Sequence, residues 1–198
     1  MVDAREGSPD TRPSLVICAW SPDETGWDPI EDLSGDPWSP TGARTDPLPA
    51  ADPETLAGAL SERLADWRCR GLLLVGRTGR GDEVLLQIRA ENRTRDGVRQ
   101  LDGDRPGVVR ATAPAAEMVR ALREAGLPAR ATSEAEDDAG SQLLYRALSE
   151  LPDGTDAPAV ALLRVPADAA DATMQRAVKV AAQAIARHLS PLPRSRAV

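Results

Sequence analysis

The stretch GLLLVG (71–76) is an unbroken apolar run that ends in glycine. Such a run is typical of a strand covered on both faces, as in a parallel sheet between layers of helices. AVALLRV (159–165) and SLVICAW (14–20) have the same character. VLLQIRA (84–90) predicts a further strand, and PARATS (128–133) predicts a short one. The chain is therefore expected to build a buried central sheet.

Segments with helical periodicity alternate with these strands. Asp52 followed by Pro53 is typical of an N-cap and a first turn, and leucines then recur at every fourth position. The same kind of periodicity predicts helices over 114–125 and 142–151, and a last helix that opens at 168–171. The inner faces are expected to carry Leu56, Leu60, Leu64, Trp67, Met118, Val119, Leu122, Ala125, Leu144, Leu148, Leu151, Met174, Ala177, Val178, Ala181, Ile185 and Leu189. Strands that alternate with amphipathic helices imply an α/β fold, a single-domain three-layer α/β/α sandwich with a mostly parallel central sheet.

Length and polarity set the expected divisions of the chain. With 198 residues, it is long enough for one domain with a sizeable core. The divisions are a disordered N-terminus (1–13), a single α/β domain (14–190) and a C-terminal tail (191–198). Residues 21–52 are acidic and contain six prolines, so they predict a loop with at most a short helix near 29–33. Residues 91–110 are charged and glycine-rich, and they also predict a loop.

Composition argues against several classes of function. The formal net charge of −7 speaks against a nucleic-acid partner, which needs clustered cations. We expect neither a signal peptide nor a membrane span, because the sequence shows no apolar run of the required length. Two cysteines do not make a disulfide framework, so a cytoplasmic setting is expected. No motif indicates a cofactor, and the acidic run 134–138 is interpreted as a surface loop rather than a metal site.

Four stretches carry a family resemblance, in this order along the chain. They are LVICAWSP (15–22), GLLLVGRTGRGDEVLLQIRAEN (71–92), ATAPAAEMVRALREAGLPA (111–129) and ALLRVP (161–166). Together they resemble the pyroglutamyl peptidases (pyrrolidone-carboxylate peptidases), cysteine peptidases that remove an N-terminal pyroglutamate. The resemblance implies a pyroglutamyl-peptidase-like α/β/α domain. It also implies a homo-oligomer, since active members of the family often form tetramers.

The sequence differs from this family at the three catalytic positions. Gln87 stands where the family has its glutamate, and Arg164 stands where the family has its histidine. The cysteine position falls on Gly140, or on Ser141 if the alignment slips by one residue. The resemblance therefore implies the scaffold of the family without its Glu, Cys and His.

Other positions in these stretches are candidates for ligand binding. Trp20 keeps one aromatic residue of the family's ring pocket, and Asn92 matches a family asparagine. The turn VGRTGRG (75–81) has the glycines of an anion-cradling loop. Arg77, Arg80 and Arg164 are expected to converge at the C-terminal ends of parallel strands, or else all three are expected to pair with Asp82, Glu83 and the acidic run 134–138. The candidate ligand-binding residues are Trp20, Arg77, Thr78, Gly79, Arg80, Asn92, Ser141 and Arg164.

Few side chains remain as candidates for catalysis. Cys18 and Cys69 lie in or beside expected core strands and are interpreted as inert structural cysteines. His188, at the end of the last expected helix, is interpreted as a surface residue. Ser141 is the best remaining nucleophile, but serine ahead of a helix is also a favoured N-cap. Arg164 cannot serve as its base.

These observations lead to two main hypotheses. The first is a pyroglutamyl-peptidase-like protein that is inactive as a cysteine peptidase. It would bind a small anionic ligand or a peptide terminus, or serve as a subunit, because triad members act as a unit and their joint loss leaves only binding. The alternative is a hydrolase, a pyroglutamyl peptidase or related amidase, with a rebuilt site centred on Ser141. A third hypothesis is that the protein has a purely structural role as a partner in an assembly.

Overall fold

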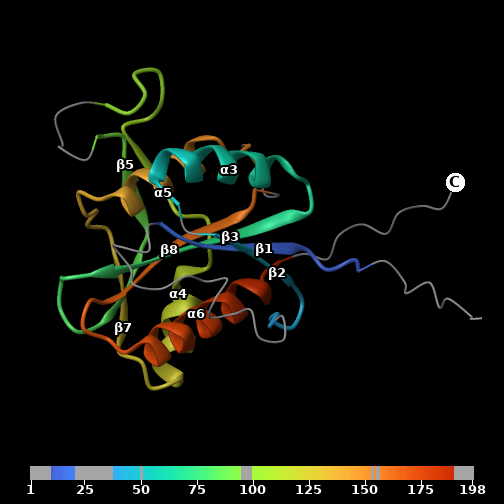
Figure 1. Cartoon of the computed structure of the whole chain (residues 1–198), viewed down its shortest axis with the longest axis vertical. Coiled ribbons are helices and arrows are strands. Elements are labelled where there is room, and N and C mark those ends of the chain that lie inside the picture. Colours follow the sequence, from blue (N-terminus) through green and yellow to red (C-terminus); the bar gives the residue numbers. More distant parts are fainter. Residues whose placement is uncertain are drawn as a thin grey trace, which may run out of the picture.

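The computed structural model describes residues 10–20, 38–49, 51–94, 100–152, 154 and 157–189. Within this part of the chain, a six-stranded sheet has the order β2-β1-β3-β8-β4-β7 (Figure 1). Its strands are β1 (Ser14–Ala19), β2 (Arg44–Leu48), β3 (Cys69–Thr78), β4 (Val84–Gln87), β7 (Ala129–Thr132) and β8 (Ala159–Pro166). Neighbouring strands are parallel except β4 and β8, which are antiparallel. The expected mostly parallel sheet is confirmed.

Helices cover both faces of this sheet. One face packs against α3 (Pro53–Ala65) and α5 (Ala139–Ser149), and the other against α4 (Ala115–Glu124) and α6 (Asp171–Ala186) (Figure 1). Alternate residues of each strand point to opposite faces. In β1, Leu15 and Ile17 join the core with α4 and α6, while Val16 and Cys18 join the core with α3 and α5. The three-layer α/β/α sandwich is therefore confirmed.

Local signals set several helix ends as expected. The Asp52 side chain accepts hydrogen bonds from the backbone N–H groups of Glu54 and Thr55, and Pro53 occupies the first turn of α3. Gly126 follows α4 with a φ of 77°, the left-handed conformation predicted for it. Trp67 does not belong to the inner face of α3, because the helix ends before it and its side chain is 55% exposed.

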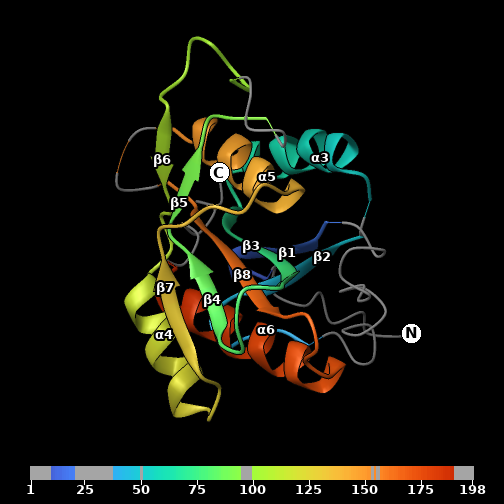
Figure 2. The ribbon, with the colours of Figure 1, turned by 90° about the vertical axis from the view of Figure 1, so that its left-hand side faces the viewer.

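The predicted strand over 84–90 is broken in two. Strand β4 ends at Gln87, and β5 (Arg89–Glu91) pairs with β6 (Val108–Arg110) in a separate antiparallel sheet. Figure 2 shows this β5–β6 hairpin extending away from the main sheet. The prediction of a loop over all of 91–110 is therefore wrong at β6. Charged composition did not prevent a strand there, because pairing with β5 supplies the backbone hydrogen bonds.

A strand also lies within the proline-rich region 21–52. Strand β2 pairs only with β1 among the described residues and contains Pro47. Proline is tolerated there because an edge strand leaves one side of its backbone without a strand partner. The short helix expected near 29–33, the N-terminus before residue 10 and the tail after 189 lie outside the described residues. No helix in the described part of the chain is long and apolar enough to cross a membrane.

Candidate functional site

A buried arginine lies at the centre of the sheet. Arg164 of β8 is 1% exposed and pairs in register with Gly76 of β3 and Leu85 of β4. Its neighbours Leu163 and Val165 point into the core with α4 and α6. The guanidinium of Arg164 therefore lies on the opposite face, the one that carries α5.

Carboxylates neutralise this guanidinium. Its Nη1 donates to Oδ2 of Asp138 at 2.5 Å, and its Nη2 donates to Oδ1 at 2.8 Å, which makes a two-point ion pair. Oε1 of Glu136 lies 3.5 Å from Nε of Arg164. The guanidinium carbon also lies 5.4 Å from the ring centroid of Trp20, a distance suited to a cation–π contact. The charge of Arg164 is thus satisfied from within the protein.

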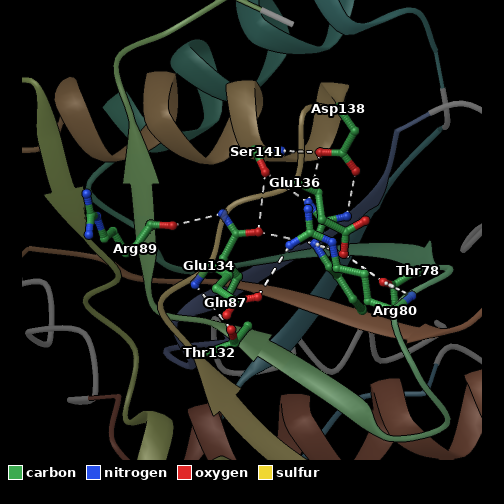
Figure 3. Close-up of polar contacts among 10 residues, drawn as sticks. Thr78, Arg80, Gln87, Arg89, Thr132, Glu134, Glu136, Asp138 and Ser141 are labelled. Carbon is green, nitrogen blue, oxygen red and sulfur yellow. Dashed lines mark hydrogen bonds and ion pairs between the residues drawn. The ribbon is translucent and has the colours of Figure 1, made fainter. Parts of the chain in front are cut away.

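Gln87 and Ser141, both labelled in Figure 3, form one hydrogen-bonded cluster with Arg164. Oε1 of Gln87 accepts from Nε of Arg164 at 3.1 Å and from Oγ of Ser141 at 3.3 Å. Nη2 of Arg164 also donates to Oγ of Ser141 at 3.0 Å. The fold therefore joins residues that lie 54 and 77 positions apart along the chain.

Ser141 is not the N-cap of its helix. Asp138 caps α5 and accepts the N–H of Ser141 at 2.9 Å, so Ser141 lies within the first helical turn. The predicted helix start at 142 is three residues late, because aspartate is as good a cap as serine and the chain turns helical directly after it. The hydroxyl of Ser141 is consequently directed at Gln87 and Arg164. Neither an amide oxygen nor a guanidinium takes up a proton at neutral pH.

Trp20 fills the space between β3 and α5. Its indole is 2% exposed and is wedged between two glycines, Gly76 and Gly140. A Cβ atom at position 76 would lie 1.7 Å from the Trp20 ring, and one at position 140 would lie 2.6 Å from it. Any side chain at position 140 would therefore need the indole to move.

Arg77, near the end of β3, and Arg80, in the turn that follows, do not meet Arg164. Arg77 turns toward the start of α6, where its Nη2 lies 2.8 Å from Oδ1 of Asp171 and its Nη1 donates to the carbonyl of Ala169 at 2.7 Å. Arg80 is half exposed, with Nη1 3.5 Å from Oε2 of Glu134. The expected convergence of the three arginines is wrong. Arg80 and Arg164 pair with the acidic run 134–138, as the alternative predicts, whereas Arg77 pairs with Asp171, which the alternative does not include.

The remaining candidates shape the surrounding loops. Thr78 donates through Oγ1 to Glu136 at 2.7 Å and accepts the N–H of Arg80 at 3.0 Å. Gly79 has open space around it. Asn92 accepts the N–H of Asp102 at 3.0 Å and donates to its carbonyl, so it ties together the connection between β5 and β6.

The residues Glu134–Asp138, here called the acidic strap, bind arginines. Glu134 pairs with Arg80, Asp137 lies 2.9 Å from Arg93, and the other two acids pair with Arg164. The described residues hold no group of three or more side chains suited to a metal ion. The interpretation of this run as a surface loop omits its role as the countercharge of Arg164, which the alternative pairing of the arginines includes. The signal was a lone arginine inside the apolar run AVALLRV, because a buried charge needs a countercharge.

Open space near the cluster is unevenly distributed. The hollow over Ser141, between the acidic strap and Arg93, has a volume of about 10 Å³, about the room for one water molecule. A larger cleft of about 230 Å³ lies between Arg80, Arg130 and Glu134. A third, more open cavity of about 440 Å³ lies beside Gly79 and Asp168.

The cysteines and the histidine lie apart from this cluster. Cys18 and Cys69 are buried, and burial raises the pKa of the Cys69 thiol to about 11. His188 is exposed just beyond α6. Ile185, one turn before His188, packs beside Gly71. Gly71 lies near the start of β3, whereas Gly76, which is in register with Arg164, lies near its other end. The interpretation of His188 as a surface residue is confirmed.

The layers and strand order define an α/β/α sandwich with a mostly parallel sheet, and solved structures show which known fold this is. Pyrrolidone carboxyl peptidase from Thermococcus litoralis matches with a TM-score of 0.73 and 16% identity, covering 89% of this chain and 94% of the other. Pyroglutamyl peptidase I from Bacillus amyloliquefaciens matches with a TM-score of 0.69 and 15% identity over 89% and 98%. Pyrrolidone carboxyl peptidase from Thermus thermophilus gives 0.65 and 22% over 86% and 98%. The chain has the fold of these peptidases. No family model and no curated protein matches its sequence.

Proposed function

We propose that this protein is a pyroglutamyl-peptidase-like protein that is inactive as a cysteine peptidase and acts through binding. Its ligand would be a small molecule or a peptide terminus, and a role as a subunit of a homo-oligomer is part of the same proposal. The observation that carries it is the two-point ion pair between Arg164 and Asp138, with Gln87 and Ser141 bonded to the same guanidinium.

The chemistry of the cluster supports inactivity. A peptidase nucleophile needs an adjacent base that a third group orients. The described hydrogen-bond partners of the Ser141 hydroxyl are Gln87 and Arg164, and neither removes its proton. Cys69 is also unsuited, since a thiol whose pKa is raised to about 11 holds almost no thiolate at neutral pH.

The available space supports the same conclusion. A substrate ring needs a pocket beside the nucleophile, yet the hollow over Ser141 has a volume of about 10 Å³. Trp20 occupies the space between β3 and α5 where the cluster begins. An indole in that position fills the space and does not form the wall of an open pocket.

The test is release of a chromophore from a pyroglutamyl-amide substrate by the purified protein. We expect no turnover above the rate without protein, for the natural chain and for Ser141→Ala alike. Ser149→Ala is the matched control, because Ser149 lies on the same helix and its hydroxyl donates to the carbonyl of Arg146. Turnover that Ser149→Ala keeps and Ser141→Ala abolishes would overturn the proposal.

That outcome would favour the alternative, a hydrolase rebuilt around Ser141. One observation speaks for it: the Ser141 hydroxyl borders the small hollow and receives a hydrogen bond from Arg164, a group suited to stabilising an oxyanion. The alternative requires a base outside the described contacts. A bell-shaped or sigmoidal pH–rate profile would then report the pKa of that base.

A further inference from the structure

The cleft of about 230 Å³ lies beside the buried cluster and has a mixed lining of charges. Its lining residues are Arg80, Gly81, Leu85, Arg130, Thr132, Glu134 and Glu136. We propose that this cleft binds a small zwitterion of amino-acid to dipeptide size, with Arg80 and Arg130 holding its carboxylate and Glu134 holding its ammonium group. This inference names the ligand for the binding role proposed above and rests on that role.

The sheet itself forms the floor of the cleft. Leu85 of β4 is in register with Arg130 of β7 on one side and Arg164 of β8 on the other, so all three side chains point to the same face. The helices on that face, α3 and α5, pack over β3 and β8. Above β4 and β7, the cleft is bordered by the acidic strap and the turn that contains Arg80, as the labelled side chains in Figure 3 show.

The charged groups at the rim are available to a ligand. Arg80 is 48% exposed and its partner Glu134 is 74% exposed, with 3.5 Å between their charged atoms. Nε of Arg130 lies 3.2 Å from Oε2 of Glu83, and these side chains are 46% and 41% exposed. Ion pairs this open to water contribute little to stability, so a ligand can replace either one at small cost. Arg164, by contrast, is committed to Asp138 and is closed to solvent.

The arrangement of charge favours a zwitterion over a simple anion. The lining includes the guanidiniums of Arg80 and Arg130, which suit a carboxylate because they bind it through directed hydrogen bonds. Glu134 and Glu136 on the same rim would repel a dianion, and the arginines would repel a dication. Glu136 already accepts from Thr78 and pairs with Arg164, which leaves Glu134 as the partner for an ammonium group. The volume is below the ~300 Å³ at which pockets for drug-sized ligands begin, so the ligand is small.

Three matched probes separate the two charges. L-alanyl-L-alanine carries both, L-alanyl-L-alaninamide lacks the carboxylate, and N-acetyl-L-alanyl-L-alanine lacks the ammonium group. We expect the dipeptide to raise the melting temperature of the full chain in a saturable way at millimolar concentration. Each analogue should bind about tenfold more weakly, the usual effect of losing one charge-assisted hydrogen-bonding group.

Two variants, each of which removes one charge, test which side chain recognises which end of the dipeptide. Arg130→Gln should abolish the preference for the dipeptide over its amide and keep the preference over the acetylated form. Glu134→Gln should do the reverse. Arg120→Gln is the control, because Arg120 lies on α4 on the other face and is 68% exposed. Because each readout is a preference between probes, a general loss of stability in a variant does not imitate it.

Two results would overturn the inference. One is the absence of any shift in melting temperature with the dipeptide. The other is an equal shift with all three probes, or the same preferences among the probes in Arg130→Gln and in Glu134→Gln. The outcome is independent of the turnover assay. If the protein is inactive and its melting temperature does not shift, only this inference fails. If the protein hydrolyses the pyroglutamyl amide and shows the crossed pattern, only the proposed inactivity fails.

Discussion

Arg164 shows how one residue determines the chemistry of the site. Replacing it by methionine keeps much of the volume but leaves the carboxylates of Asp138 and Glu136 without their shared cation. Removing one partner of a buried pair costs about 3 kcal/mol or more, because the other charge stays desolvated. We expect Arg164→Met to lower the free energy of unfolding, measured in urea, by about 3 kcal/mol.

A second substitution tests whether the unpaired charge is the cause. Asp138→Asn removes the charge and keeps a side chain that caps α5 well. The double variant Arg164→Met/Asp138→Asn should therefore be more stable than Arg164→Met alone. If the double variant is less stable than either single variant, the ion pair is not what sets the cost.

Cys69 gives the protein an alkaline sensitivity. Burial raises its pKa from 9.0 to about 11, so between these values the folded chain holds a proton that the unfolded chain releases. The contribution of Cys69 to stability is complete below pH 9 and is lost as the pH rises toward 11. The slope reaches about 1.4 kcal/mol per pH unit. Cys69→Ala should flatten the fall of the unfolding free energy over this interval, and an unchanged profile would show that other groups cause it.

At this scale, the sequence predicts which residues are unusual but not all of their partners. The resemblance points to Gln87, Arg164 and either Gly140 or Ser141, and the fold brings Gln87, Ser141 and Arg164 together. Pairing of Arg164 with the acidic run 134–138 is one of the two predicted alternatives, but the choice of Asp138 as its two-point partner is not, because that choice depends on the path of the acidic strap. Sequence spacing carries no information about such a path.

At the scale of elements, the packing of α5 on β3 depends on the glycines around Trp20. A methyl group at position 140 would lie 2.6 Å from the indole, so helix and ring would have to separate. We expect Gly140→Ala to lower the free energy of unfolding by about 2 kcal/mol, the usual cost of overpacking a core.

Gly58 supplies the matched control for this prediction. It lies on the exposed side of α3, and a Cβ there has no heavy atom within 4 Å. Gly58→Ala should stabilise the protein by about 0.5 kcal/mol through helix propensity alone. If Gly140→Ala and Gly58→Ala both stabilise the protein, the Trp20 ring moves at little cost and its packing against Gly140 does not fix the position of α5.

The elements that the sequence predicts correctly are those with local causes. Strand β3 follows from its apolar run, and α3 follows from Asp52 and the leucine spacing. Strand β6 and the break at Ile88 were missed because their hydrogen bonds join distant segments: the N–H of Ile88 donates to the carbonyl of Thr132, and its carbonyl accepts from Ala111. Non-local pairing of this kind overrides local composition.

At the scale of the whole molecule, stability is expected to divide between the central sheet and the β5–β6 hairpin. Strands β1, β3 and β8 each have a strand on both sides and helices on both faces. Among the described residues, the hairpin pairs with no strand of the central sheet. It packs on α5 through Ala90 and Val109, and a two-stranded pair is only marginally stable without such packing. One attachment is the hydroxyl of Tyr145 on α5, which donates to the carbonyl of Pro106 at 2.7 Å.

Amide hydrogen exchange measures this division directly. We expect β3 to exchange at the rate of global unfolding and β6 to exchange faster through local opening. Tyr145→Phe keeps the buried ring but removes the hydrogen bond to Pro106, so exchange at Val108–Arg110 should accelerate about tenfold while β3 changes little. Equal acceleration in both strands would mean that the hairpin and the central sheet unfold as one unit.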